Sequence, residues 1–143
     1  MKNKVIILLM LAAALITLGG CEHKPGPDVS IDYGSSEIYS REDMDEAIEL
    51  IVKEFDTWRG CELHSIAYGS DEACNADNLA WMNELGAADG AGETFTQCIE
   101  FISDFHSPKN GGGAWNPDQE YTGWQWWLAR TEDGPWQLMT WGY

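Results

Sequence analysis

The side chains best suited to proton transfer in this chain of 143 residues are two histidines and two nearby carboxylates. Asp104 and His106 are two residues apart, so they share one face if the strand predicted there continues to residue 106. A carboxylate beside an imidazole can orient a general base or support a metal ligand. Glu100 and His64, also on predicted strands, complete the set of candidates for acid–base chemistry.

A simpler interpretation of these residues is a surface ion pair at the end of a strand. A structural metal site needs about four ligands, and only His64 and His106 supply imidazoles within the predicted domain. We favour the ion pair, and the sequence therefore predicts no metal site, no cofactor and no catalytic residue.

The thiols offer a second kind of chemistry. Cys61 and Cys74 flank a polar loop, and a disulfide between them would stabilise the fold by ~3 kcal/mol in the chain-entropy treatment. Cys98 is left without a partner in that scheme. Three buried thiols are the alternative, and we slightly favour the bridge.

The C-terminal part of the chain is rich in tryptophan. With alternation along a strand, Trp124, Trp126 and Arg130 share one face, and Trp127 lies on the other. The same alternation in the last strand sets Trp136 and Leu138 against Met139, Trp141 and Tyr143. Both faces of a predicted hairpin are therefore aromatic.

Two explanations fit a hairpin with two aromatic faces. Either the second face is covered, by residues 69–93, by residues 106–120 or by a partner chain, or it is an open platform that stacks on sugar rings or grips a peptide. We favour the covered face. If a platform exists, the candidate ligand-binding residues are Trp115, Trp124, Trp126 and Arg130.

The N-terminus has the pattern of a targeting segment. Lys2 and Lys4 precede an apolar stretch over 5–18, which is too short to cross a membrane comfortably but suits a signal peptide. The residues Leu18-Gly19-Gly20-Cys21 that follow resemble the lipobox of bacterial lipoproteins. That resemblance implies cleavage before Cys21, attachment of a diacylglyceryl group to its sulfur, and a chain anchored to the cell membrane on the extracytoplasmic side.

The charge of the chain excludes one class of partner. The formal net charge is −16, and no basic patch is present to neutralise phosphates, so we predict no nucleic-acid binding. The hydrophobic content of 44% is high enough for a packed core. We predict a signal peptide over 1–20, a flexible tether over 21–38 and one domain over 39–143.

The spacing of apolar residues predicts the elements of that domain. Ser40-Arg41-Glu42-Asp43 matches a capping box, and apolar residues at helical spacing follow it. Phe95, Ile99, Phe101 and Phe105 are expected on one strand face. The elements we expect are a helix from 40 to about 58, a strand over 61–68, a short helix over 75–85, and strands over 94–105, 121–131 and 136–143, the last two joined by Glu132-Asp133-Gly134.

This order of elements resembles the cystatin-like and nuclear-transport-factor-2-like domains. The resemblance implies an α+β fold in which an N-terminal helix packs on a curved antiparallel sheet of about four strands. A short helix would lie in the connection between strands 1 and 2. No catalytic residue is carried over, because no matching motif is present.

The function predicted from these features is that of a non-catalytic binding or protein-interaction module for a protein, peptide or glycan. One alternative is a small hydrolase that uses Glu100, Asp104 or His106 in a cavity of the curved sheet. Another is an accessory structural lipoprotein of the envelope. An open edge, at the strand 61–68 or at the C-terminal strand, also allows a homodimer.

Overall fold

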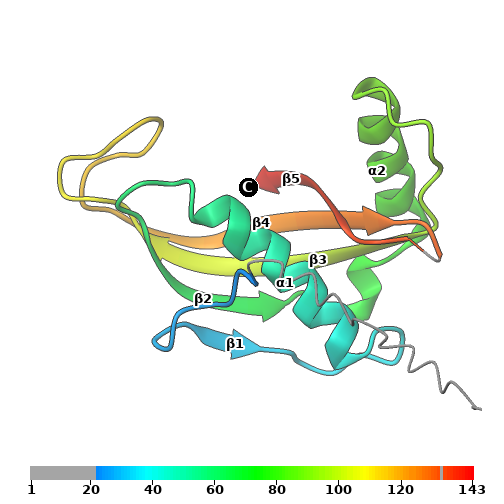
Figure 1. The fold of residues 1–143 in the computed structure, drawn as a ribbon, viewed down its shortest axis with the longest axis horizontal. Helices are drawn as coiled ribbons and strands as arrows, with labels where there is room; N and C mark the ends of the chain where they lie inside the picture. Colours follow the sequence, from blue (N-terminus) through cyan, green and yellow to red (C-terminus); the bar gives the residue numbers. More distant parts are fainter. Residues whose placement is uncertain (1–21, 133) are drawn as a thin grey trace, which may run out of the picture.

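A computed structural model describes residues 22–132 and 134–143 (Figure 1). The signal peptide over 1–20, Cys21 of the lipobox and Asp133 of the predicted turn lie outside these residues. In the two described segments, no helix combines the length and hydropathy needed to cross a membrane. The elements, in chain order, are β1 (Ser30–Asp32), α1 (Arg41–Phe55), β2 (Glu62–Tyr68), the 3-10 turn η1 (Asp71–Ala73), α2 (Ala76–Ala88), β3 (Gln97–His106), β4 (Glu120–Arg130) and β5 (Gln137–Gly142).

The fold is α+β, as predicted, but the sheet is mixed and has five strands. The strands lie in the order β1-β2-β3-β4-β5, with β1 parallel to β2 and the other neighbours antiparallel. The additional strand, β1, comes from the segment 21–38 for which we expected a flexible tether. Three residues are too few to show an alternating pattern, which is why the sequence did not reveal this strand.

The position of β1 corrects two further expectations. The domain opens with this strand rather than with the helix. β2 is flanked by β3 on one side and, at residues 65–67, by β1 on the other, so this part of the strand does not offer a free edge for a homodimer. The edge strands are β1 and β5.

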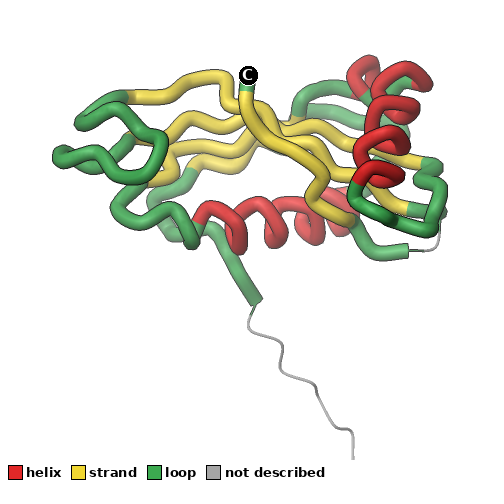
Figure 2. Tube along the Cα trace, turned by 90° about the horizontal axis from the view of Figure 1, so that it is seen from above, coloured by secondary structure: helices red, strands yellow, loops and turns green. Residues whose placement is uncertain are grey.

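Helix α1 packs along one face of the sheet (Figure 2). Ser40 caps it: its hydroxyl accepts from the backbone N–H of Asp43, whose side chain accepts from the backbone N–H of Ser40. The buried helix residues Ala47 and Ile51 have no exposed surface, and they face strand residues such as Ile66, Phe101 and Leu128. The main core therefore lies between α1 and the sheet.

Helix α2 covers part of the opposite face. Met82 of α2 is fully buried in a second cluster with Phe95, Cys98 and Trp127. We expected Phe95 on the same face as Ile99. This was wrong because β3 begins only at Gln97, and Phe95 precedes the strand and turns toward α2.

A β-bulge changes the orientation of the last strand. Trp127 pairs with Thr140, but Leu128 pairs with Leu138, so Met139 is an extra residue in β5. Trp141 consequently lies opposite Trp126 and on the same face. The predicted placement of Trp141 opposite to Leu138 was wrong, because simple alternation does not hold across a bulge.

We expect the packing of α2 to contribute a measurable part of the stability. Met82→Ala removes a fully buried side chain and should lower the free energy of unfolding by ~2–5 kcal/mol. Glu84→Ala, on the exposed side of the same helix, should change it by no more than ~0.5 kcal/mol. Urea unfolding followed by tryptophan fluorescence measures both, and equal stability of the two variants would contradict the packing described.

Candidate functional site

Trp126 is part of the core and offers no surface to a ligand. Its side chain is fully buried, and its indole N–H donates to the Ser103 hydroxyl at 2.8 Å. Trp58 stacks on it with ring centroids 5.1 Å apart. Its predicted role in ligand binding is therefore not supported by its position.

Arg130 also has a structural role. Its guanidinium lies 2.8 Å from Asp43 at the start of α1, donates to Gln97 at 2.6 Å, and sits 4.2 Å above the ring of Trp136. Burial opposes the ionisation of Asp43, but the backbone N–H of Ser40 and the guanidinium of Arg130 outweigh it and lower the Asp43 pKa. Arg130, in β4, thus joins α1 to β3 and to the residue that precedes β5.

The other two candidates, Trp115 and Trp124, belong to a dense aromatic cluster. Its members are rings from the turn after α1, the end of β3, the loop 107–119, β4 and β5. Trp58 lies at its centre, with centroids 4.9 Å from Trp115 and 5.9 Å from Trp124. The aromatic cluster consists of Trp58, Phe105, Trp115, Tyr121, Trp124, Trp141 and Tyr143.

A tight turn fixes Trp58 in the middle of this cluster. The backbone N–H of Trp58 donates to the carbonyl of Phe55, and Cys61 N–H donates to the carbonyl of Trp58. Gly60 has a φ of 79°, and a Cβ atom there would lie only 3.0 Å from Pro108. The turn therefore requires glycine for both its conformation and its close contact with the loop 107–119.

One side of the aromatic cluster reaches the solvent. Trp141 is 40% exposed and Tyr143 is 77% exposed, while Trp115 and Trp124 are half-buried beside them. Tyr143 meets Trp124 edge to face at 5.1 Å. We call Trp115, Trp124, Trp141 and Tyr143 the aromatic surface.

The aromatic surface contains an unusual polar atom. Among the described residues, the indole Nε1 of Trp124 is buried and has no hydrogen-bond partner. An unsatisfied buried donor costs about 1–3 kcal/mol, so such groups are uncommon in folded proteins. A ligand oxygen that reached this atom would recover that energy.

The second aromatic face of the hairpin is covered, which agrees with the interpretation we favoured. Trp127 is buried, and Trp81 of α2 meets its ring edge to face at 5.6 Å. The covering element lies within residues 69–93. Trp81 itself remains 39% exposed on the outer side of the helix.

The predicted pair of Asp104 and His106 does not form. Ser103 pairs with Trp124 and Phe105 pairs with Tyr121, so β4 has one extra residue opposite Asp104, and the Asp104 carboxylate accepts from the backbone N–H of Gly123 in that bulge. His106 instead contacts Asp118 through Nε2 and Glu120 through Nδ1, both at 2.9 Å. Glu100 lies six residues earlier in β3, about 20 Å away along the strand.

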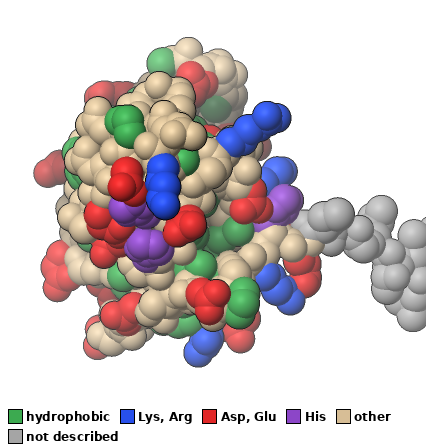
Figure 3. Space-filling model, turned by 90° about the vertical axis from the view of Figure 1, so that its left-hand side faces the viewer, with side chains coloured by type: hydrophobic (Ala, Val, Ile, Leu, Met, Phe, Trp, Pro, Cys, Tyr) green, Lys and Arg blue, Asp and Glu red, His purple; other side chains and the backbone are tan. Residues whose placement is uncertain are grey.

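His64 joins the same set of charges from β2. Its Nδ1 lies 2.8 Å from the other oxygen of Glu120, and its ring is 6.4 Å from that of His106. Figure 3 shows histidine side chains among acidic side chains at this end of the molecule. We call His64, His106, Asp118 and Glu120 the histidine clasp, because it ties the end of the loop 107–119 to β2 and β3.

The histidine clasp is largely exposed. Within residues 22–132 and 134–143, no group of three or more His, Cys, Asp or Glu side chains has the geometry to hold a metal ion. Hydrogen bonds to Asp118 and then to Glu120 raise the pKa of His106. Burial opposes ionisation of Glu120, but hydrogen bonds from His106 and His64 outweigh it and lower the Glu120 pKa.

The three thiols in the described part of the chain are free. Cys61 precedes β2, whereas the Cys74 sulfur lies 3.6 Å from the hydroxyl of Tyr68 at the other end of the strand, so a strand about 20 Å long separates the two cysteines. A disulfide requires Cα atoms within about 7 Å, and the predicted bridge is therefore wrong. Burial raises the pKa of Cys98 to about 11, which makes this thiol unreactive.

Comparisons with protein-family models, with curated proteins and with solved structures find no match to this chain. The resemblance to cystatin-like and nuclear-transport-factor-2-like domains therefore stays a prediction based on element order. We therefore infer the function from the geometry of the aromatic surface and of the histidine clasp.

We expect the histidine clasp to make stability depend on pH. Because its folded pKa is raised above the ordinary 6.5, His106 contributes stability that is fully present below about pH 6.5 and is lost as the pH rises through the folded pKa. Glu120, with a lowered pKa, contributes stability above its ordinary value of 4.5 and loses it in acid.

The melting temperature of His106→Gln should therefore fall furthest below that of the unsubstituted chain at about pH 5.5, and the gap should narrow by about pH 8.5. Asp118→Asn removes the negative charge from one of the two acceptors and should reproduce part of this behaviour. Thermal unfolding followed by circular dichroism measures the effect. A gap that is constant across the range would show that the clasp does not act through protonation.

Proposed function

We propose that this protein is a lipid-anchored, extracytoplasmic binding module that does not catalyse a reaction. The resemblance of Leu18-Gly19-Gly20-Cys21 to a lipobox supports anchoring to the membrane through Cys21. The partly open aromatic surface supports the binding role, and it is the observation on which the proposal depends.

A sugar ring is the ligand whose chemistry suits the aromatic surface best. The apolar face of a sugar can stack on the exposed rings of Trp141 and Tyr143. Sugar oxygens can also accept a hydrogen bond, and among the described residues Trp124 Nε1 is a buried donor without a partner. A small shift of the rings packed around Trp124 would give a ligand oxygen access to this donor.

The positions of the acid–base candidates support binding rather than catalysis. Asp104 and His106 engage separate partners, and Glu100 lies six residues earlier in β3, so the three do not converge on one point as a catalytic pair must. Hydrolysis in a cavity of the sheet is therefore the weaker alternative. A structural role in the envelope, including homodimer formation through the edge of β5, is the other.

We also propose that the domain is related in fold to the cystatin-like domains. A single helix laid along an antiparallel set of strands supports it, α2 occupies the connection in which the resemblance implies a short helix, and β1 would then be an addition to that plan.

Titration of the full chain in detergent with soluble oligosaccharides, including cell-wall fragments, tests the proposal. Trp141→Ala should weaken binding by about five- to tenfold, because one aromatic contact is worth about 1 kcal/mol. Trp81→Ala is the matched control, since Trp81 has nearly the same exposure but lies on α2. Tryptophan fluorescence reports the binding.

The control distinguishes the aromatic surface from tryptophan content in general. Equal weakening by Trp81→Ala would contradict the proposed site. Binding of peptides but of no oligosaccharide would replace the sugar with a peptide ligand. A folded protein that binds neither would move the function to an envelope protein partner.

A further inference from the structure

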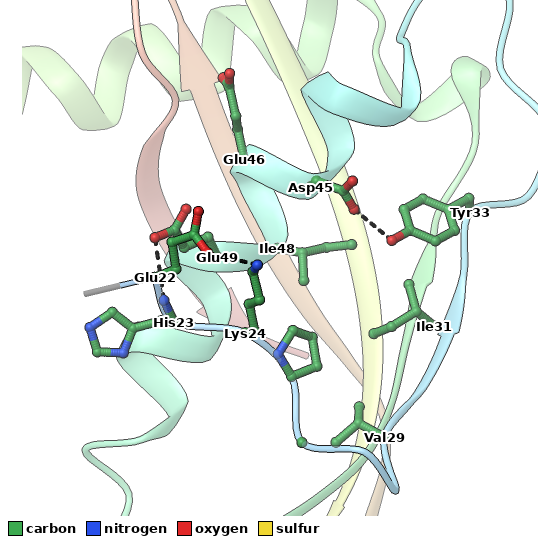
Figure 4. A pocket seen from close by; sticks show the side chains of 12 residues that line it. Glu22, His23, Lys24, Val29, Ile31, Tyr33, Asp45, Glu46, Ile48 and Glu49 are labelled. Carbon is green, nitrogen blue, oxygen red and sulfur yellow. Dashed lines mark hydrogen bonds and ion pairs between the residues drawn. The ribbon is translucent and has the colours of Figure 1, made fainter. Parts of the chain in front are cut away.

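A second hollow of the molecule shares no residue with the aromatic surface. A cavity of about 520 Å³ lies between the N-terminal segment 22–33 and α1 (Figure 4). This volume falls in the range of small-molecule sites. We call it the N-terminal groove.

The inner wall of the N-terminal groove is apolar. Val29 and Ile31 line it from the segment around β1, and Ile48 lines it from α1. The ring of Tyr33 closes one side (Figure 4). A ligand with a short hydrocarbon stem could bury that stem against these side chains.

The rim of the groove carries an excess of negative charge. Four carboxylates line it, those of Glu22, Asp45, Glu46 and Glu49, against the single ammonium of Lys24. Asp45 and Glu49 are four residues apart on α1, a spacing at which two like charges repel. A cation placed between them would relieve that repulsion.

Two of the rim carboxylates are already held in place. Asp45 accepts a hydrogen bond from the Tyr33 hydroxyl at 2.5 Å, and Glu49 accepts one from the backbone N–H of His23 at 3.3 Å. Each keeps a second oxygen for another donor. The groove is therefore preorganised for a positively charged group, which lowers the entropy lost on binding.

Lys24 shows which kind of group this rim accepts. Its ammonium pairs with Glu22 at 2.7 Å. The hydrogen bond and charge of Glu22, followed by the charges of Glu49 and Asp45, raise the pKa of Lys24. Lys24 thus places an alkylammonium group of the chain itself in the electrostatic field of the same carboxylates. Its ion pair with Glu22 is exposed, and it is weak enough for a ligand to displace it.

We infer that the N-terminal groove binds a primary ammonium group on an apolar stem, as found in a free alkylamine or in a lysine side chain of a peptide. The stem lies on Val29, Ile31 and Ile48, and the ammonium lies between Asp45 and Glu49. Lys24 competes with the ligand for these carboxylates.

Titration of the full chain in detergent with hexylamine tests this inference by isothermal calorimetry. We expect saturable binding at one site. Hexanol, which lacks the charge, and methylamine, which lacks the stem, should each bind at least about tenfold more weakly. An acetylated, amidated tripeptide with a central lysine shows whether a peptide can supply the same group.

Substitutions of opposite effect make the test specific. Glu49→Gln should weaken hexylamine binding by about tenfold, whereas Lys24→Gln should strengthen it by a few-fold because the internal competitor is gone. Glu84→Gln on α2 is the control: it removes the same charge from an exposed position away from the groove.

The inference is overturned by equal weakening in Glu84→Gln, which would reveal attraction to the net charge alone, or by weakening in Lys24→Gln. A titration in which hexylamine shows no saturable binding also overturns the inference. These variants do not alter the aromatic surface. The test of oligosaccharide binding can therefore succeed or fail independently of the test with hexylamine.

Discussion

The structure depends on a mismatch between the length of its main helix and that of its sheet. The 15 residues of α1 span about 22 Å, whereas the 11 residues of β4 span about 36 Å. One helix therefore leaves part of the sheet face uncovered. Large side chains must fill that part, because exposed strand faces of this size would bind other chains.

The aromatic cluster covers the part of the sheet face that α1 leaves open. Trp58 follows α1 directly and continues its packing onto Phe105 and Trp126. Trp115 reaches the same place from the loop 107–119, which Ser107 anchors through hydrogen bonds to the backbone of Asn116 and Gln119. The covering is therefore made of rings rather than of a helix, and its outer edge stays partly open.

The sequence predicted the elements that have a clear period. The start of α1 at its capping box, the α2 region, and the faces of Trp124, Trp126 and Trp127 follow from local rules. These rules count residues along one chain segment. They describe an element well when its neighbours do not disturb it.

The errors come from places where pairing between strands decides the geometry. The bulge at Met139 turns Trp141 to the face of α1, and the extra residue of β4 opposite Asp104 brings the backbone N–H of Gly123 to that carboxylate. No composition signal marks either bulge. β1 was missed for a related reason, since its three residues become a strand only by pairing with β2.

The histidine clasp shows how the same long-range pairing builds a polar site. Glu120 begins β4 opposite His106 in β3, and His64 lies in β2 next to them. Nothing in the sequence spacing of residues 64, 106 and 120 indicates that they meet. The strand pairing alone brings two imidazoles to one carboxylate.

The pairing of β1 also changes what the N-terminal segment does. A flexible tether would let the domain move freely relative to an anchor at Cys21. Instead, the described chain contacts α1 from His23 onward and enters the sheet at Ser30. With acylation at Cys21 as proposed, the spacer between lipid and folded protein is therefore short. The N-terminal groove, lined by Glu22, would then lie close to the membrane, and the acidic rim would keep its mouth clear of anionic headgroups.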